Sequence, residues 1–82
     1  MIDPLICKLI LQSLDQCRGL MLPETTLLAQ VNIVLPEPIP DAEIREHAQW
    51  CIDQGWALTK TDEFRRRKYW ITESGQIRLR SL

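Results

Sequence analysis

The sequence is poor in the residues and motifs that enzymes use for catalysis. It contains one histidine, His47, and three glycines, with no glycine-rich phosphate loop and no nucleophile motif. The carboxylates are scattered over predicted helix starts, so no acid–base pair is indicated. His47 lies at helical spacing between Glu43 and Cys51, where a half-buried helix residue is favoured over a general base. We therefore expect no enzyme, no catalytic residues and no cofactor.

Cysteine is also sparse, and no C-x-x-C pair occurs. An odd number of widely spaced cysteines, Cys7, Cys17 and Cys51, argues against a disulfide framework and for a reducing compartment. His47 and Cys51 would share one helix face, but they supply only half of the ligands that a structural zinc site needs. The pattern predicts buried structural cysteines, no metal ion and a cytoplasmic protein.

Long apolar runs are missing as well. No run approaches the roughly 20 residues that cross a bilayer, which predicts that the protein has no membrane partner. Met1–Pro4 lacks the basic region and cleavage site of a signal peptide. Hydrophobic residues make up 45% of the 82 residues and charged residues 26%, as in ordinary globular domains. We expect one domain over residues 1–82, without repeats or linkers.

Charge is unevenly distributed although the formal net charge is only −1. Residues 1–55 carry three cations and eight acids, whereas residues 56–82 carry seven cations and three acids. Attraction to phosphate is therefore expected only from the C-terminal third.

Three segments show helical spacing of apolar residues, at about 4–18, 24–35 and 41–54. Asp3 and Pro4 suit the start of the first helix, and Gly19 its end; Asp41 is expected to cap the third helix, and Gly55 to end it. A short strand is possible at residues 20–22. The proline-rich stretch 36–40 predicts a stiff connector.

After Gly55 the spacing of apolar residues changes to two, which predicts a β-hairpin at about 56–72. Thr72 then suits the start of a short closing turn or helix, although Gly75 is unfavourable in a helix. Apolar spacing places Val34 on the stripe of the second helix. The expected core comprises Ile6, Leu9, Ile10, Leu14, Leu27, Leu28, Val31, Leu35, Ile44, Ala48, Cys51, Ile52, Trp56, Leu58, Tyr69 and Ile71.

This order resembles a winged helix-turn-helix domain, of a small bacterial, phage or mobile-element type. The resemblance rests on "IREHAQWCIDQGWALT", a helix ending in glycine before an apolar residue opens the wing, and on "RKYWITESGQIRL", an aromatic–aliphatic–Thr wing exit. It implies an α+β fold with three helices, a C-terminal hairpin wing and a short closing element. It also implies either a DNA-binding transcriptional regulator or a non-catalytic protein-interaction module.

The third helix departs from a typical recognition helix. Its first turns carry Asp41, Glu43 and Glu46, which would oppose phosphates. Arg45 and Gln49 are the only evident base or phosphate readers on it. Its preceding connector is also longer than the usual three- or four-residue turn.

The hairpin, by contrast, is basic. We expect Arg65, Arg66, Arg67 and Lys68 to contact double-stranded DNA weakly, with little sequence preference. If Tyr69 and Ile71 pack on the core, alternation points Arg66, Lys68 and Trp70 outward, where Trp70 could stack on a base or a protein. The alternative is a charged hairpin that prevents edge-to-edge aggregation, or one that docks an acidic protein.

The first helix is more apolar than one core face requires. Ile2, Leu5 and Leu11 lie off its main stripe. This surplus suggests a homodimer through the first helix. Nothing in the sequence indicates a small-molecule ligand.

Overall fold

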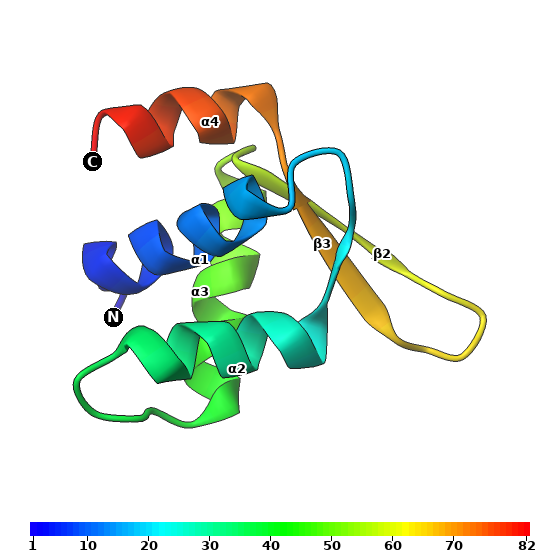
Figure 1. The fold of residues 1–82 in the computed structure, drawn as a ribbon, viewed down its shortest axis with the longest axis horizontal. Coiled ribbons are helices and arrows are strands. Elements are labelled where there is room, and N and C mark those ends of the chain that lie inside the picture. The colour runs from blue at the N-terminus through cyan, green and yellow to red at the C-terminus, as the bar shows by residue number, and fades with distance from the viewer.

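The computed structural model describes residues 1–82, and its helices and strands follow the expected order (Figure 1). The elements are α1 (Pro4–Gln16), β1 (Leu22–Pro23), α2 (Glu24–Val34), α3 (Asp41–Asp53), β2 (Ala57–Thr61), β3 (Arg67–Ile71) and α4 (Glu73–Arg80). The α+β winged-helix prediction is confirmed: three helices precede a hairpin wing, and a short helix closes the chain. None of these helices is long and apolar enough to cross a membrane.

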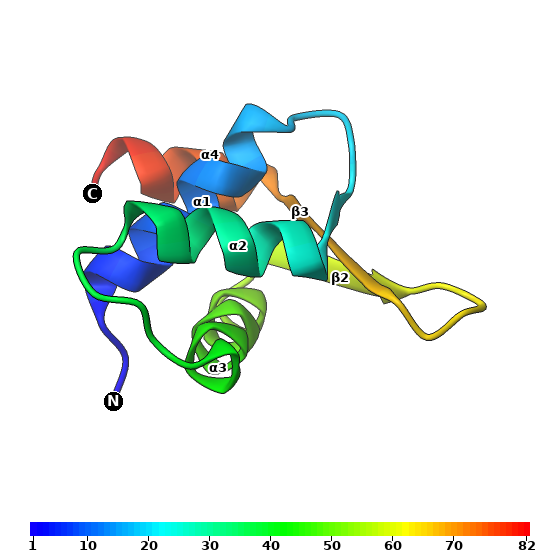
Figure 2. The same ribbon diagram turned by 60° about the horizontal axis from the view of Figure 1, so that its bottom comes forward.

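The three strands form one antiparallel sheet in the order β1-β3-β2. The β2–β3 hairpin leaves the helical body as a projecting wing, on the side away from both chain termini (Figure 2). β1 is shorter than the expected strand and lies two residues later; it pairs Leu22 with Tyr69. The sheet therefore ties the start of α2 to the wing.

α1 forms the centre of the helical body and contacts α2, α3, α4 and β3. The Asp3 carboxylate caps it by accepting the Leu5 N–H at 2.9 Å, with Pro4 in the first turn. The helix ends at Gln16, two residues before the expected end, because Cys17 and Arg18 donate to carbonyls only three residues back. Gly19 follows in the left-handed region, with φ +88°.

These contacts account for most of the apolar surplus on α1. Leu11 is fully buried and Ile2 packs partly against the core, whereas Leu5 remains 48% exposed. Two of the three side chains that suggested a homodimer are therefore covered within one chain. The reason is that α1 is surrounded on several sides, so a wide apolar arc is needed inside one molecule.

The predicted core is correct except at the start of the wing and in three half-buried side chains. Leu58 is 45% exposed, whereas Ala57 is buried, so the predicted phase of β2 was wrong by one residue. The register explains this: Ala57 lies opposite the buried Ile71, and Leu58 lies opposite Trp70 on the outer face. Leu35, Ile52 and Trp56 are partly buried against the core. Leu11 and Leu22 join the core as residues that the sequence had not placed there, together with Cys7, which was expected to be buried but was not assigned to the core.

Two helix ends also differ from expectation. Val34, which apolar spacing placed on the stripe of the second helix, is the last residue of α2 and is 62% exposed, so that placement was wrong. Asp41 is the first residue of α3 and not its cap; Pro40 takes the cap position, and no side chain caps this helix. The connector before it is fixed by Asn32, whose side chain accepts the Ile39 N–H at 3.0 Å and donates to the Ile39 carbonyl at 3.2 Å.

The closing element is a helix, α4, in spite of Gly75. The Thr72 hydroxyl accepts the Gly75 N–H at 3.0 Å and donates to the Gly55 carbonyl at 2.6 Å. A Cβ at position 75 would lie 2.0 Å from the carbonyl oxygen of Trp56. Glycine is thus required here by the close approach of α4 to the start of the wing.

Candidate nucleic-acid interface

Asp62 builds the tip of the wing. Its Oδ1 accepts the backbone N–H groups of Phe64 at 2.8 Å and Arg66 at 2.9 Å. The hydrogen bond from the Arg66 N–H, together with that from Phe64, lowers the pKa of the Asp62 carboxyl. The tip therefore has a defined shape although it is exposed.

The arginines of this tip are only lightly engaged. Arg65 lies in the left-handed region with φ +60° and forms no ion pair. Arg66 lies 3.4 Å from Asp62 Oδ2 and 5.0 Å from the centroid of the Phe64 ring, but its side chain is 71% exposed. Both guanidinium groups thus remain available to a phosphate.

Strand alternation divides the remaining predicted wing residues between two faces. Arg67 shares the inner face with Tyr69, and its guanidinium lies 5.9 Å from that ring centroid. Lys68 and Trp70 point to the outer face, where the register places them opposite Lys60 and Leu58. Arg66, which alternation had placed beside them, precedes β3 and belongs to the tip loop. A single flat surface therefore cannot contact Arg67 on the inner face and Lys68 and Trp70 on the outer face at the same time.

The two predicted readers of α3 are engaged within the chain. Arg45 Nε donates to Glu24 Oε1 at 3.0 Å, and Gln49 Nε2 donates to Asp53 Oδ1 at 3.0 Å. The acids Asp41, Glu43 and Glu46 on the same helix are exposed. α3 therefore presents more free carboxylates than free donors.

Glu24 is a key residue that the sequence did not reveal as such. The Tyr69 hydroxyl donates to its Oε2 at 2.6 Å, so this carboxylate joins α2, α3 and β3. Burial opposes the charged form of Glu24, but the hydrogen bonds from Tyr69 and Arg45 outweigh it, and its pKa is lowered. Burial and the bond to Glu24 raise the pKa of Tyr69 to about 12. In sequence, Glu24 is indistinguishable from a helix-start acid that favours the helix dipole.

His47 has a structural role. It is buried, more deeply than predicted; its Nε2 accepts the Asp3 N–H at 3.0 Å, so its proton lies on Nδ1 and faces the Glu43 carbonyl at 2.6 Å. Cys7 and Cys51 are buried beside each other, as expected of structural cysteines, whereas Cys17 is only partly buried, so that prediction fails at Cys17. The hydrogen bond with Cys7 and burial raise the pKa of Cys51. No three His, Cys, Asp or Glu side chains gather where they could hold a metal ion.

The comparisons with known proteins support the fold alone. No family model matches the sequence, and no curated protein matches it. The structure resembles the crystal structure of the putative transcriptional regulator TA0346 from Thermoplasma acidophilum, with a TM-score of 0.76 and 18% sequence identity. The match covers 94% of this chain and 73% of the other. At this identity the likeness establishes a shared architecture, which agrees with the winged-helix assignment.

Proposed function

We propose that the protein is a non-catalytic DNA-binding regulator that contacts the duplex backbone mainly through the tip of its wing. The observation that carries this is the fixed tip loop, in which Asp62 holds the backbone while Arg65 and Arg66 remain exposed. Arg67 extends the same cationic edge along the inner face of the hairpin. The structural likeness to a chain named as a putative transcriptional regulator supports this proposal.

Sequence preference should be weak. Base-specific contacts would have to come from Arg45 and Gln49, which are bonded to Glu24 and Asp53. Contact with a base would require both side chains to break these hydrogen bonds. The exposed acids Asp41, Glu43 and Glu46 would also approach the phosphates at the same time. Lys68 and Trp70 lie on the other face of the hairpin and contribute only if the duplex wraps around the wing.

Duplex affinity measured at several salt concentrations tests this proposal. Each neutralised phosphate adds roughly −0.9 to the slope of log K against log salt, so the three wing arginines predict a slope of about −3. The double variant Arg65→Ser with Arg66→Ser should reduce the slope to about −1 and abolish most binding at physiological salt. Arg67 is left in place because it lies over the Tyr69 ring.

A charge-matched control is Lys8→Ser with Arg80→Ser, which removes two cations from α1 and α4 and leaves the wing intact. This variant should retain the wild-type slope. If it weakens binding as much as the wing variant does, net charge and not the wing is responsible. Circular dichroism should show that both variants stay folded.

A protein-interaction module is the second candidate. The exposed acids on α3 and the internal bonds of its two potential readers favour it. A folded wild-type protein that shows no duplex affinity near 50 mM salt would reject DNA binding in favour of this candidate.

A further inference from the structure

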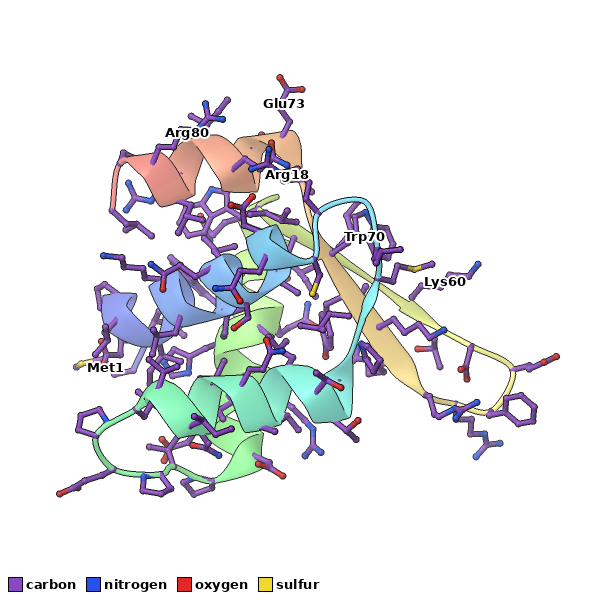
Figure 3. All side chains as sticks on the ribbon, in the orientation of Figure 1. Met1, Arg18, Lys60, Trp70, Glu73 and Arg80 are labelled. Atoms are coloured by element: carbon purple, nitrogen blue, oxygen red, sulfur yellow. The ribbon has the colours of Figure 1, made fainter.

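A hollow of about 520 Å³ lies beneath the loop that leads from α1 to β1. The last turn of α1 and residues 18–21 form one wall, and Trp70 and Ile71 of β3 with Lys60 of β2 form the other. Figure 3 shows Arg18, Trp70 and Lys60 grouped around this loop. Its volume falls within the usual range of small-molecule sites, about 300–1,000 Å³.

The lining is predominantly apolar although it faces solvent. Six of the nine lining residues are hydrophobic. At the rim, Leu20 is 73% exposed and Met21 46% exposed, beside the partly buried indole of Trp70. A planar or chain-like apolar group placed here would remove these side chains from water and could stack on the indole.

The charged groups of the hollow are not equivalent. Arg18 is paired with Asp15, whose Oδ1 lies 2.6 Å from Arg18 Nη2. Lys60 forms no ion pair within the chain, so it is the unneutralised cation of the lining. An apolar surface that ends at one free ammonium group complements a molecule with an apolar body and one negative charge.

We propose that this hollow binds a small amphipathic organic anion, with its apolar body against Trp70, Leu20 and Met21 and its carboxylate on Lys60. The site is distinct from the tip of the wing and does not depend on DNA binding. The site forms only in the folded chain, because the loop is distant in sequence from the β2–β3 hairpin that makes the other wall.

The test uses the full chain, labelled with ¹⁵N, and two probes of the same shape: 2-naphthoate and its neutral analogue 2-naphthamide. The indole N–H resonance of Trp70, assigned with Trp70→Phe, reports binding. Naphthoate should shift it saturably, and naphthamide should bind about tenfold more weakly. The indoles of Trp50 and Trp56, which pack against each other at 5.2 Å, should not shift.

Two variants locate the anion. Lys60→Met should weaken naphthoate about tenfold and leave naphthamide unchanged, because it keeps the stem and removes the charge. Lys8→Met, on α1 and outside the lining, should change neither. Both positions are at least partly exposed, so both variants are expected to fold.

Cys17 gives an independent signal, because it is partly exposed and lines the hollow while the other two cysteines are buried. Saturating naphthoate should slow alkylation of Cys17 by iodoacetamide. Equal affinity for both probes, unchanged naphthoate affinity in Lys60→Met, or unprotected Cys17 would each overturn the proposal. The proposal would also fail if sedimentation showed a stable dimer and Cys17 resisted alkylation in that dimer without any probe, because a second copy of the chain would then cover the hollow.

Discussion

The Tyr69 hydroxyl donates a 2.6 Å hydrogen bond to the Glu24 carboxylate, across 45 residues of sequence. Arg45 donates to the other oxygen of the same carboxylate. Through Glu24 the wing strand β3 is therefore linked to the starts of both α2 and α3, so the orientation of the wing depends on a partly buried charged network. This arrangement also engages the guanidinium of Arg45 with Glu24, although the Arg45 side chain stays 48% exposed, so the group is not free to read a base.

Removal of this carboxylate should destabilise the fold. Glu24→Ala leaves the Tyr69 hydroxyl and the Arg45 guanidinium without their acceptor, and we expect a loss of about 2 kcal/mol in the free energy of unfolding. Glu24→Gln should lose less, because the amide oxygen still accepts from Tyr69. Urea denaturation measures both, with Glu37→Ala, an exposed acid of the connector, as the control. Equal stabilities for Glu24→Ala and Glu37→Ala would contradict this role.

The same network predicts how stability depends on pH. The lowered pKa of Glu24 stabilises the fold above the unfolded value of about 4.3, and this contribution is lost as pH falls through the folded value. The pKa of Tyr69, raised to about 12, stabilises the fold below the unfolded value of about 10, and this contribution is lost as pH rises toward 12. Denaturation of the wild type and of Tyr69→Phe should therefore give free energies that converge between about pH 10 and 12. If the free energies of unfolding of the wild type and of Tyr69→Phe differed by a constant amount over that range, the raised pKa of Tyr69 would not contribute to stability.

Loss of Asp62 should loosen the tip of the wing without unfolding the domain. Asp62→Ala removes the acceptor of the Phe64 and Arg66 N–H groups, and limited trypsin digestion after Arg65 and Arg66 should become faster. Asp62→Asn keeps a side-chain oxygen and should be cleaved at an intermediate rate. Glu63→Ala, an exposed neighbour, is the control; cleavage of Asp62→Ala at the rate of this control would show that the tip is not held by Asp62.

Gly75→Ala should be destabilising, contrary to helix propensity. In an open helix this change stabilises by roughly 0.5–1 kcal/mol. Here the new methyl would lie 2.0 Å from the Trp56 carbonyl oxygen and 2.7 Å from Ile71 Cγ1, so overpacking of about 1–3 kcal/mol should dominate. Thermal unfolding compares it with Ser74→Ala, an exposed position in the same turn. A melting temperature of Gly75→Ala at or above that of the wild type would contradict the tight contact between residue 75 and the Trp56 carbonyl oxygen.

Local signals in the sequence determined the helices and the hairpin. Asp3 and Pro4 begin α1, Thr72 caps α4, and Gly55, directly after the C-cap Gln54 of α3, adopts φ +82° as a helix-ending glycine does. Gly19 also has a positive φ, of +88°, but it lies two residues beyond the C-cap Cys17 of α1. These signals act between residues close in the chain, so they can be recognised in the sequence without knowledge of the fold. The outward direction of Lys68 and Trp70 also followed from alternation once Tyr69 and Ile71 were placed in the core.

The tertiary structure alone decided the phase of β2, the burial of Leu11 and the surroundings of the predicted site residues. Ala57 and Leu58 are both apolar, so a period of two cannot tell which one faces the core; pairing with Ile71 decides it. The pairing of Arg45 with Glu24 and the hollow between Arg18, Lys60 and Trp70 join segments far apart in sequence. Such contacts depend on how whole helices and strands pack together, and the spacing of apolar and charged residues along the chain does not determine that packing.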